Sequence, residues 1–407
     1  MSLSLEDQLQ MRELELNDLF EIIRAINSNA TEDNLYRIYK FTLSSNPTID
    51  KLALCVRENE AAEWVCKVSF GAAYPTEGQV LERDLSQITQ TPDGRIPDFA
   101  EFETIIPIRH KNKVLAQVLL APPKDSTTVK ALDINFLDTL SNIIIVAVEN
   151  KKLARKQKKQ EALRRQLEIA KDVQNLLFPK ALPYNDRLKV AANYHPHHTV
   201  GGDYYDFISI DADRFLICVA DVSGKGVPAA ILMSNFQAAL RVMVHHTNDL
   251  RTIVEQLNRL IIQNSGGGSF ITAFFAIYDF KTYSLTYINA GHNPPFLFRG
   301  NSDEVQFLSE GTTIIGGFDP LPFLNLSTIN NLNRFLLFCF TDGFTETYNE
   351  AGEELGEDNL CQYVKDNLQL PPKLLHEQLL SYLNKFKGDA KLADDVTLIS
   401  CRVDATA

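Results

Sequence analysis

Aspartates stand at the ends of several predicted strands in the C-terminal half of the chain, and carboxylates placed in this way can bind metal ions. Asp203 starts a strand, whereas Asp221 and Asp342 each end an apolar one. Asp394 and Asp395 precede the run VTLIS. Each aspartate alone is ordinary turn chemistry. Clustered carboxylates, however, repel one another unless cations neutralise them, and oxygen-only ligands suit hard ions such as Mg²⁺ or Mn²⁺. Two such ions would clamp a phosphate and make a hydroxide nucleophile from water.

The glycines after Asp221 raise a second interpretation, a nucleotide-binding loop. The segment reads VADVSGKGVPAA, with Gly224, Lys225 and Gly226 where a strand passes into a helix. A Walker loop needs Ser or Thr after the lysine and another glycine five residues earlier, and a dinucleotide fingerprint needs a third glycine; this segment has none of these. The glycines instead allow a tight turn close to an ion. Pro228 suits the first turn of the following helix.

The region from about residue 183 is rich in predicted strands. These are KVAANYHP, DYYDFISID, RFLICVADV, ITAFFAIYD, SLTYINAG, PPFLFRG, RFLLFCFTDG and DVTLISCRV. Helical apolar stripes mark VPAAILMSNFQAALRVMVHH, LRTIVEQLNRLIIQ and PKLLHEQLLSYLNKF. Strands grouped in hairpins with few helices between them predict antiparallel sheets that carry helices on their faces.

The N-terminal region mixes helices with strands. Helical spacing marks IIRAINSNATEDNLYRIYKFTLS, and alternation marks KLALCVREN and WVCKVSFG as strands, so Cys55 and Cys66 are expected to be packing residues. TIIPIRHKNKVLAQVLLAPP predicts two strands joined at 110–113. No proline or glycine occurs between Leu132 and Leu177, which predicts one long helix.

The charged middle of this long helix carries a coiled-coil-like seam in alternating three- and four-residue steps. The seam positions are Leu153, Lys156, Gln160, Leu163, Leu167, Ala170, Gln174 and Leu177. Two interpretations are open: a parallel homodimer through this helix, or a single amphipathic helix packed on the next domain. The basic run KKLARKQKKQEALRR is expected to be a solvated helix face rather than a nucleic-acid site.

Composition narrows the class of protein. A chain of 407 residues predicts two or three domains, and 45% hydrophobic with 23% charged residues is typical of a globular protein. The formal net charge of −12 argues against a general nucleic-acid or membrane binder. The six cysteines are scattered, and the N-terminus lacks a signal-peptide pattern. The most apolar helical stretch, at 143–148, is too short to span a membrane. These features predict a cytoplasmic protein.

Five motifs then occur in one order: VGGDYYDF, ADVSGKGVPAAILM, NAGHNPP, TDGFTE and DDVTLI. Together with AKDVQNLLFP at 170–179, they resemble the bacterial RsbU/SpoIIE-like branch of the metal-dependent protein phosphatase 2C superfamily, over residues 165–403. The resemblance implies an α+β fold, an αββα sandwich of two antiparallel sheets. It also implies hydrolysis of phosphoserine or phosphothreonine by metal-activated water, without a covalent enzyme intermediate. The preceding region resembles an α/β GAF-like sensor domain, joined by a long helical linker.

The resemblance also assigns roles to residues. Two divalent ions, manganese or magnesium, are the expected cofactors, and Asp203 and Asp221 are the expected catalytic pair. The expected metal ligands are Asp203, Asp221, the Val222 carbonyl, Asp342 and Asp394. Support of the substrate or of the loops is expected from Gly202, Gly224, Lys225, His292 and Asp395. The ligand of the GAF-like domain stays unknown.

Two residues depart from the family pattern. Ser223 stands where eukaryotic relatives have a histidine proposed as the general acid, and Lys225 stands where many bacterial relatives have a histidine. The acid that protonates the leaving group is therefore unassigned, and Lys225 either attracts the phosphate or is a solvated loop residue. The run HPHH at 195–198 lacks a second pair of ligands at zinc spacing and is not expected to be a zinc site.

The predicted domains are an N-terminal helix (1–19), a GAF-like sensor domain (20–150), a coiled-coil-like signalling helix (151–182) and a phosphatase domain (183–404). The predicted function is a serine/threonine protein phosphatase in bacterial signalling. Its expected substrate is a phosphorylated anti-sigma-factor antagonist, a small STAS-domain protein, and the GAF-like domain is expected to control it. The alternative is a catalytically weak or inactive scaffold protein with the phosphatase fold in the same pathway.

Overall fold

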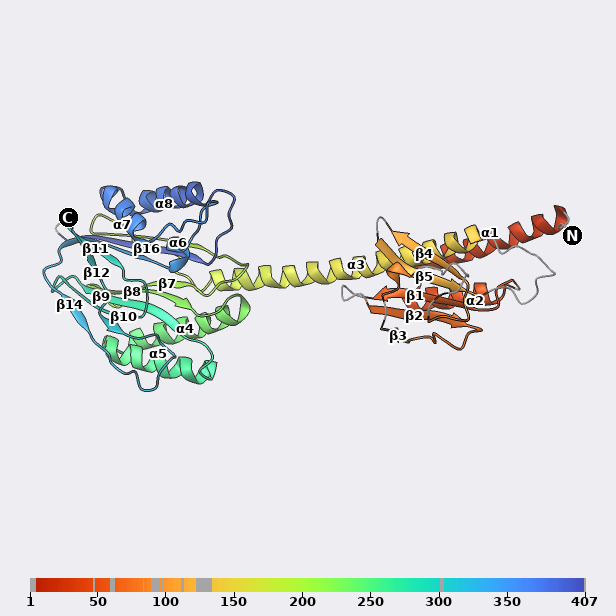
Figure 1. Ribbon diagram of the computed structural model, residues 1–407. Coiled ribbons are helices and arrows are strands. Elements are labelled where there is room, and N and C mark those ends of the chain that lie inside the picture. The colour runs from red at the N-terminus through yellow and green to blue at the C-terminus, as the bar shows by residue number, and fades with distance from the viewer. Residues whose placement is uncertain are drawn as a thin grey trace. The chain divides into compact units, whose positions relative to one another are not determined.

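The computed structural model describes residues 5–405, except positions 47, 59–62, 83, 89–95, 97, 111–112, 122–133 and 301–303. Contacts divide the chain into two compact units, Met1–Ala162 and Leu163–Ala407 (Figure 1). Each unit has hydrophobic clusters of its own. The turn predicted at 110–113 has its two central residues, 111–112, outside the described residues.

The first unit is built on a five-stranded antiparallel sheet in the order β3-β2-β1-β5-β4. Its strands are β1 (Leu52–Glu58), β2 (Glu63–Phe70), β3 (Val80–Leu81), β4 (Thr104–His110) and β5 (Lys113–Leu120). Its helices are α1 (Leu5–Asn27), α2 (Glu32–Ser44), the 3-10 turn η1 (Leu85–Gln87) and the first part of α3 (Ile134–Asn175). One hydrophobic cluster joins the helices to the sheet, and a second contains Cys55 and Cys66 as packing residues.

The helical pattern at 22–44 covers the end of one helix and the whole of a second. α1 ends at Asn27, and Asn29 adopts a left-handed φ of 60°. The Thr31 hydroxyl then accepts a hydrogen bond from the Asn34 amide at 3.3 Å and caps α2, which satisfies one of its free N–H groups. α1 also runs through the predicted boundary at 19/20. Ile22, near the end of this helix, is fully buried in the core of the unit.

Helix α3 has 42 residues, as the absence of proline and glycine predicted. Residues 153–166 of this helix are exposed, including the seam position Leu163. The predicted seam does not stay free along its whole length, however. Leu167 is half-buried, and Gln174 is buried, with its side-chain amide donating to the Gly201 carbonyl at 2.7 Å. The last turns of α3 therefore pack on the second unit, and only 153–166 remains for a partner helix.

The second unit contains two sheets. The first has six strands, β7 (Tyr204–Ser209), β8 (Arg214–Val222), β9 (Ile271–Asp279), β10 (Ser284–Ala290), β13 (Gly311–Thr312) and β14 (Ser327–Ile329). The second has five, β6 (Leu188–His195), β11 (Phe296–Arg299), β12 (Val305–Phe307), β15 (Arg334–Phe340) and β16 (Val396–Asp404). All pairs are antiparallel except β10 with β13. The helices are α4 (Val227–His246), α5 (Leu250–Ser265), α6 (Asp342–Thr345), α7 (Glu357–Asp366) and α8 (Pro372–Lys387).

Three apolar clusters show how these elements are layered. α4 and α5 pack on the sheet that contains β8 and β9, α7 and α8 pack on the sheet that contains β15 and β16, and the third cluster lies between the sheets. Figure 1 shows these helix pairs on opposite sides of the strands. The predicted mixed architecture with antiparallel sheets is confirmed. The short strands β12 to β14 and helix α7 were not predicted, because each is too short for its periodicity to stand out.

Helix α4 is long and apolar enough to cross a membrane by length and composition, which corrects the view that 143–148 is the most apolar helical stretch. Such a composition is also that of a core helix. Met233, Phe236 and Leu240 of α4 are fully buried in the cluster between α4 and the sheet. Its apolar face is therefore used inside the domain.

An ion pair fastens α4 to the sheet beneath it. Asp206 on β7 is fully buried and accepts hydrogen bonds from Arg241 Nε at 2.7 Å and from Arg241 Nη2 at 3.0 Å. The Tyr204 hydroxyl donates to the same carboxylate. A buried charge is tolerated only with partners of this kind.

Replacing Arg241 with alanine is expected to lower the free energy of unfolding by roughly 2 kcal/mol, because Asp206 stays buried without its cation. Urea unfolding followed by circular dichroism measures this. The exposed Arg259 on α5 offers a matched control as Arg259→Ala, which should change stability by less than about 0.5 kcal/mol. Equal stability of the two variants would contradict the assignment.

Candidate metal centre

The predicted aspartates meet at one edge of the second unit, although they come from two different sheets. Asp203 directly precedes β7 and Asp221 lies at the end of β8, in the six-stranded sheet. Asp342 follows β15 and opens α6, and Asp394 and Asp395 precede β16, in the other sheet. The edge is therefore a junction between the two sheets.

Hydroxyl groups from the second sheet hold Asp203 at this junction. Thr341 Oγ1 donates to Asp203 Oδ2 at 2.8 Å, and Thr397 Oγ1 donates to the same oxygen at 2.5 Å. Asp203 is only 1% exposed. Burial, and next the charges of Asp221 and Asp395, raise its pKa well above the ordinary value despite these hydrogen bonds. The carboxylate is oriented, but its charge is not compensated.

Burial and the charges of nearby carboxylates also raise the pKa values of Asp221 and Asp342. Burial and then the charges of Asp342 and Asp394 raise the pKa of Asp221 to about 7. Burial and then Asp394 raise the pKa of Asp342. Burial and mutual repulsion therefore favour the protonated forms of these groups, whereas a divalent ion would relieve the repulsion between their charged forms.

Glycines allow the backbone to close tightly around this edge. A Cβ atom on Gly202 would lie 2.8 Å from the Val222 carbonyl oxygen, the expected backbone ligand. A Cβ on Gly343 would lie 2.0 Å from the Asp395 carbonyl oxygen. Side chains at these positions would push the strand ends apart, so the glycines are needed for close approach.

The donor set fits hard divalent ions, which prefer carboxylate and carbonyl oxygens. Asp203, Asp221 and the Val222 carbonyl would hold one ion, and Asp221, Asp342 and Asp394 a second. Within the described part of the chain, no three His, Cys, Asp or Glu side chains already surround one point.

Asp395 has a structural part in this arrangement. Its Oδ1 accepts from the His197 amide at 2.7 Å, and its Oδ2 accepts from the Gly202 amide at 2.8 Å and the Asp203 amide at 3.4 Å. These bonds connect the start of β16 to the loop before β7. His197, from the HPHH run, thus contributes its backbone here.

Lys225 reaches the same edge from the loop after β8. Its Nζ lies 2.7 Å from Asp394 Oδ2 and donates to the Ala393 carbonyl at 2.8 Å. Gly224 and Gly226 on either side have φ values of 95° and 73°, which favour glycine. The sequence left two alternatives for Lys225, attraction of the phosphate or a solvated loop residue, and neither included this ion pair.

Ser223 and His292 are both engaged in structural contacts. The Ser223 hydroxyl accepts from the Phe270 amide at 2.8 Å. The His292 ring contacts Thr272 Oγ1 through Nδ1 at 3.0 Å and the Phe340 carbonyl through Nε2 at 3.1 Å. His292 thus links β9 to the end of β15, just before Asp342.

Sequence reasoning missed the two threonines that hold Asp203 and the glutamine that holds Gly201. Thr341 and Thr397 were visible inside the motifs TDGFTE and DDVTLI, next to the aspartates. Gln174 stands at a position of the predicted seam, yet its side chain bonds both the carbonyl and the amide of Gly201 at 2.7 and 3.3 Å. The polar side chain at a seam position was the available signal.

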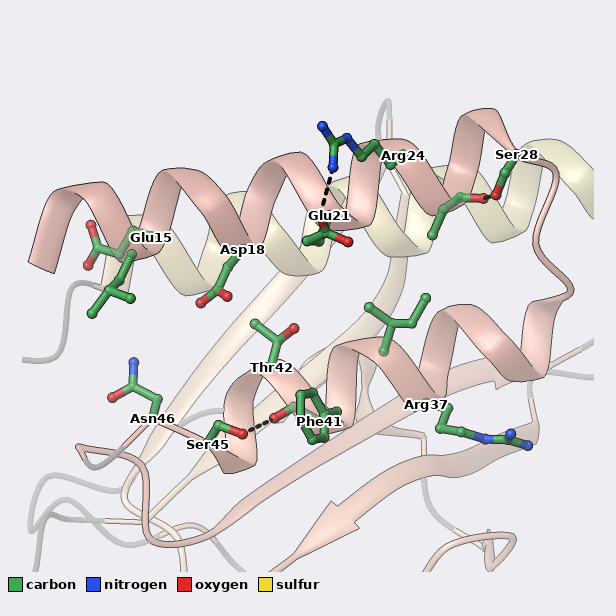
Figure 2. A pocket seen from close by; sticks show the side chains of 13 residues that line it. Glu15, Asp18, Glu21, Arg24, Ser28, Arg37, Phe41, Thr42, Ser45 and Asn46 are labelled. Carbon is green, nitrogen blue, oxygen red and sulfur yellow. Dashed lines mark hydrogen bonds and ion pairs between the residues drawn. The ribbon is translucent and has the colours of Figure 1, made fainter.

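A separate groove of about 840 Å³ lies in the first unit, between α1 and α2. Figure 2 shows Glu15, Asp18 and Glu21 on one wall and Phe41 on the other. Burial and the neighbouring Glu15 raise the pKa of Asp18. Arg24 and Arg37 line the same groove, and the Arg24 guanidinium pairs with Glu21 at 3.1 Å, so the groove carries charges of both signs.

The His292→Gln variant tests the neutral state of this histidine. Burial lowers the pKa of His292 from 6.5 to about 4, so below pH 6.5 the unfolded chain binds a proton that the folded chain does not. Stability is therefore lost as the pH falls from 6.5 towards 4, with a slope of up to about 1.4 kcal/mol per pH unit. Urea unfolding at several pH values should show a flatter dependence in His292→Gln.

The exposed His245 provides the control as His245→Gln, which should keep the wild-type slope. The acidic residues titrate in all three proteins, so the difference between the curves isolates His292. Parallel curves for wild type and His292→Gln would show that the ring is already charged in the folded protein.

Comparisons with known proteins agree with this geometry. The family model of stage II sporulation protein E (SpoIIE) matches residues 211–404, which include Asp221, Asp342 and Asp394 but not Asp203. Phosphoserine phosphatase RsbU of Bacillus subtilis is 27% identical over 341 residues, 80% of this chain and 96% of that protein. Phosphoserine phosphatase RsbP of the same organism is 25% identical over 240 residues, 58% of this chain and 57% of that protein.

The solved SiaA-PP2C domain of Pseudomonas aeruginosa has a TM-score of 0.54 and 22% identity, and covers 60% of this chain and 99% of that domain. It shows that the fold is shared. With the family match and the acidic junction of two antiparallel sheets, these findings show that the second unit is similar to SpoIIE/PP2C-like phosphatase domains.

Proposed function

We propose that the protein is a metal-dependent phosphatase of phosphoserine or phosphothreonine in proteins, acting in bacterial signalling. The observation that carries the proposal is the meeting of aspartates from two sheets at one edge, where burial and mutual repulsion raise their pKa values. Perturbed acidic groups of this kind mark functional sites. The similarity to proteins named phosphoserine phosphatases supports the same reaction.

The residues of the chain would act by position and charge. Two divalent ions, manganese or magnesium, would when bound stabilise charge on the phosphate and supply a hydroxide nucleophile at neutral pH. Asp203 and Asp221 would orient that centre from one sheet, and Asp342 and Asp394 from the other. The threonine hydroxyls on Asp203 keep one of its oxygens turned away, so the other can face the centre.

The proton for the leaving group would come from water rather than from a histidine. Ser223 is bonded to the backbone of Phe270, and both ring nitrogens of His292 have partners. Burial also lowers the pKa of His292 to about 4, so its ring is neutral at physiological pH. Neither residue is placed as a general acid.

The resemblance to RsbU/SpoIIE-like phosphatases supports a phosphorylated anti-sigma-factor antagonist, a STAS-domain protein, as the substrate. The same resemblance supports a cytoplasmic location and a GAF-like sensor role for the first unit. In that role, the unit would respond to an unknown ligand or partner and control dephosphorylation of the antagonist through α3.

Helix α3 offers a physical route for this control. Gln174 at its end bonds both backbone groups of Gly201, two residues before Asp203. Any shift of the helix end would therefore pull on the strand that carries the aspartate. A homodimer through the exposed stretch 153–166 would let a change in the first unit alter the position of α3.

A scaffold protein with little activity is the second candidate. The ion pair between Lys225 and Asp394 favours it, because one expected ligand is already occupied by a positive side chain. The full set of carboxylates favours the enzyme.

The Asp221→Asn variant separates the two candidates. It removes the charge shared by both expected ion positions, so hydrolysis of a chromogenic aryl phosphate with Mn²⁺ should fall by at least about a hundredfold. Asp358→Asn, at an exposed position on α7, makes the same chemical change away from the site and should keep wild-type activity. If wild type shows no hydrolysis with any divalent ion, the scaffold function holds instead.

The homodimer is tested by sedimentation of the full chain. At micromolar concentration, the wild type should sediment at twice the 45.8 kDa of one chain. The double variant Leu153→Glu/Leu163→Glu places like charges on the exposed seam and should be monomeric. Leu326→Glu, at an exposed leucine of the phosphatase domain, should remain a dimer. A monomeric wild type would refute the dimer.

A further inference from the structure

We propose that Lys225 is a built-in cation that competes with the second divalent ion for Asp394. The inference rests on the proposed metal centre and adds an account of how readily its second position fills. Lys225 matches no nucleotide-binding pattern, yet it lies at the acidic edge.

The loop after β8 is shaped to deliver this lysine. Gly224 and Gly226 both have left-handed φ values, and a Cβ atom on either would meet nothing within 4 Å. Crowding therefore does not explain the glycines, but the backbone turn does. The turn carries Lys225 across to the loop before β16, where its Nζ reaches Asp394 and the Ala393 carbonyl.

The oxygens of Asp394 are both engaged in this state. Oδ1 accepts the Asp395 amide at 2.8 Å, and Oδ2 pairs with Lys225 at 2.7 Å. An ion that uses Asp394 must share or take over the oxygen that Lys225 contacts. It must also approach an ammonium group of like charge, which disfavours both being present together.

The surroundings do not lock Lys225 in place. Its side chain is 48% exposed, so it can leave the carboxylate at modest cost. The ion pair between Lys225 and Asp394 is therefore reversible, and it neutralises part of the negative charge at the acidic edge.

The two ion positions should consequently differ. The position formed by Asp203, Asp221 and the Val222 carbonyl lacks a competing cation in the described contacts of these groups. The position that uses Asp394 must first displace Lys225. Filling of the second position would thus be the weaker step, and the step that depends on the free concentration of the ion.

Isothermal titration of the full chain with Mn²⁺ tests this without measuring activity. Lys225→Gln should bind the weaker ion about three- to fivefold more tightly, the size expected for an exposed ion pair, and leave the tighter ion unchanged. Lys225→Arg keeps the charge and should resemble wild type. Lys281→Gln, which removes an exposed lysine paired with Asp213, is the control for net charge.

The effect should also shrink at high salt, which screens exposed pairs. Unchanged or weaker binding of the second ion in Lys225→Gln would overturn the inference while leaving the metal centre intact. An equal gain in Lys281→Gln would also overturn it, since the cause would then be net charge alone. If the wild type binds no Mn²⁺, both the metal centre and this inference fall.

Discussion

Electrostatic repulsion among aspartates at one edge of the phosphatase domain is the constraint on which the rest of the site depends. Folding brings carboxylates from two sheets together and removes them from water, so burial first and the neighbouring charges next raise the pKa values of Asp203, Asp221 and Asp342. Such an arrangement persists only because the surrounding core is large and the strand ends are held in place. It is also what makes the edge attractive to divalent ions.

The backbone and small polar groups carry much of that support. Thr341 and Thr397 fix Asp203 from the opposite sheet, and Asp395 accepts amides from the loop before β7. Gly202 and Gly343 permit the close approach. The site is therefore a junction between the two sheets as well as a set of ligands. Changes that separate the sheets would weaken the site before any ligand is lost.

Two contacts link this junction to elements outside the two sheets. Gln174 connects the end of α3 to the strand start that carries Asp203, and Lys225 connects the loop before α4 to Asp394. The first offers a route by which the first unit could act on the site. The second supplies positive charge from within the chain, so the acidic edge is partly neutralised before any ion arrives.

The sequence by itself determined the longer strands and helices of the phosphatase domain and the aspartates that are candidates for the site. β8, β9 and α4 have the bounds that their apolar patterns predicted, because periodicity is a local property. The motifs likewise pointed to the aspartates as a group. The tertiary structure alone decided that Thr341 and Thr397 hold Asp203, that Lys225 pairs with Asp394, and that Gln174 faces its own domain. These contacts join residues far apart in the chain, and only the packing of two sheets and a helix end sets their distances.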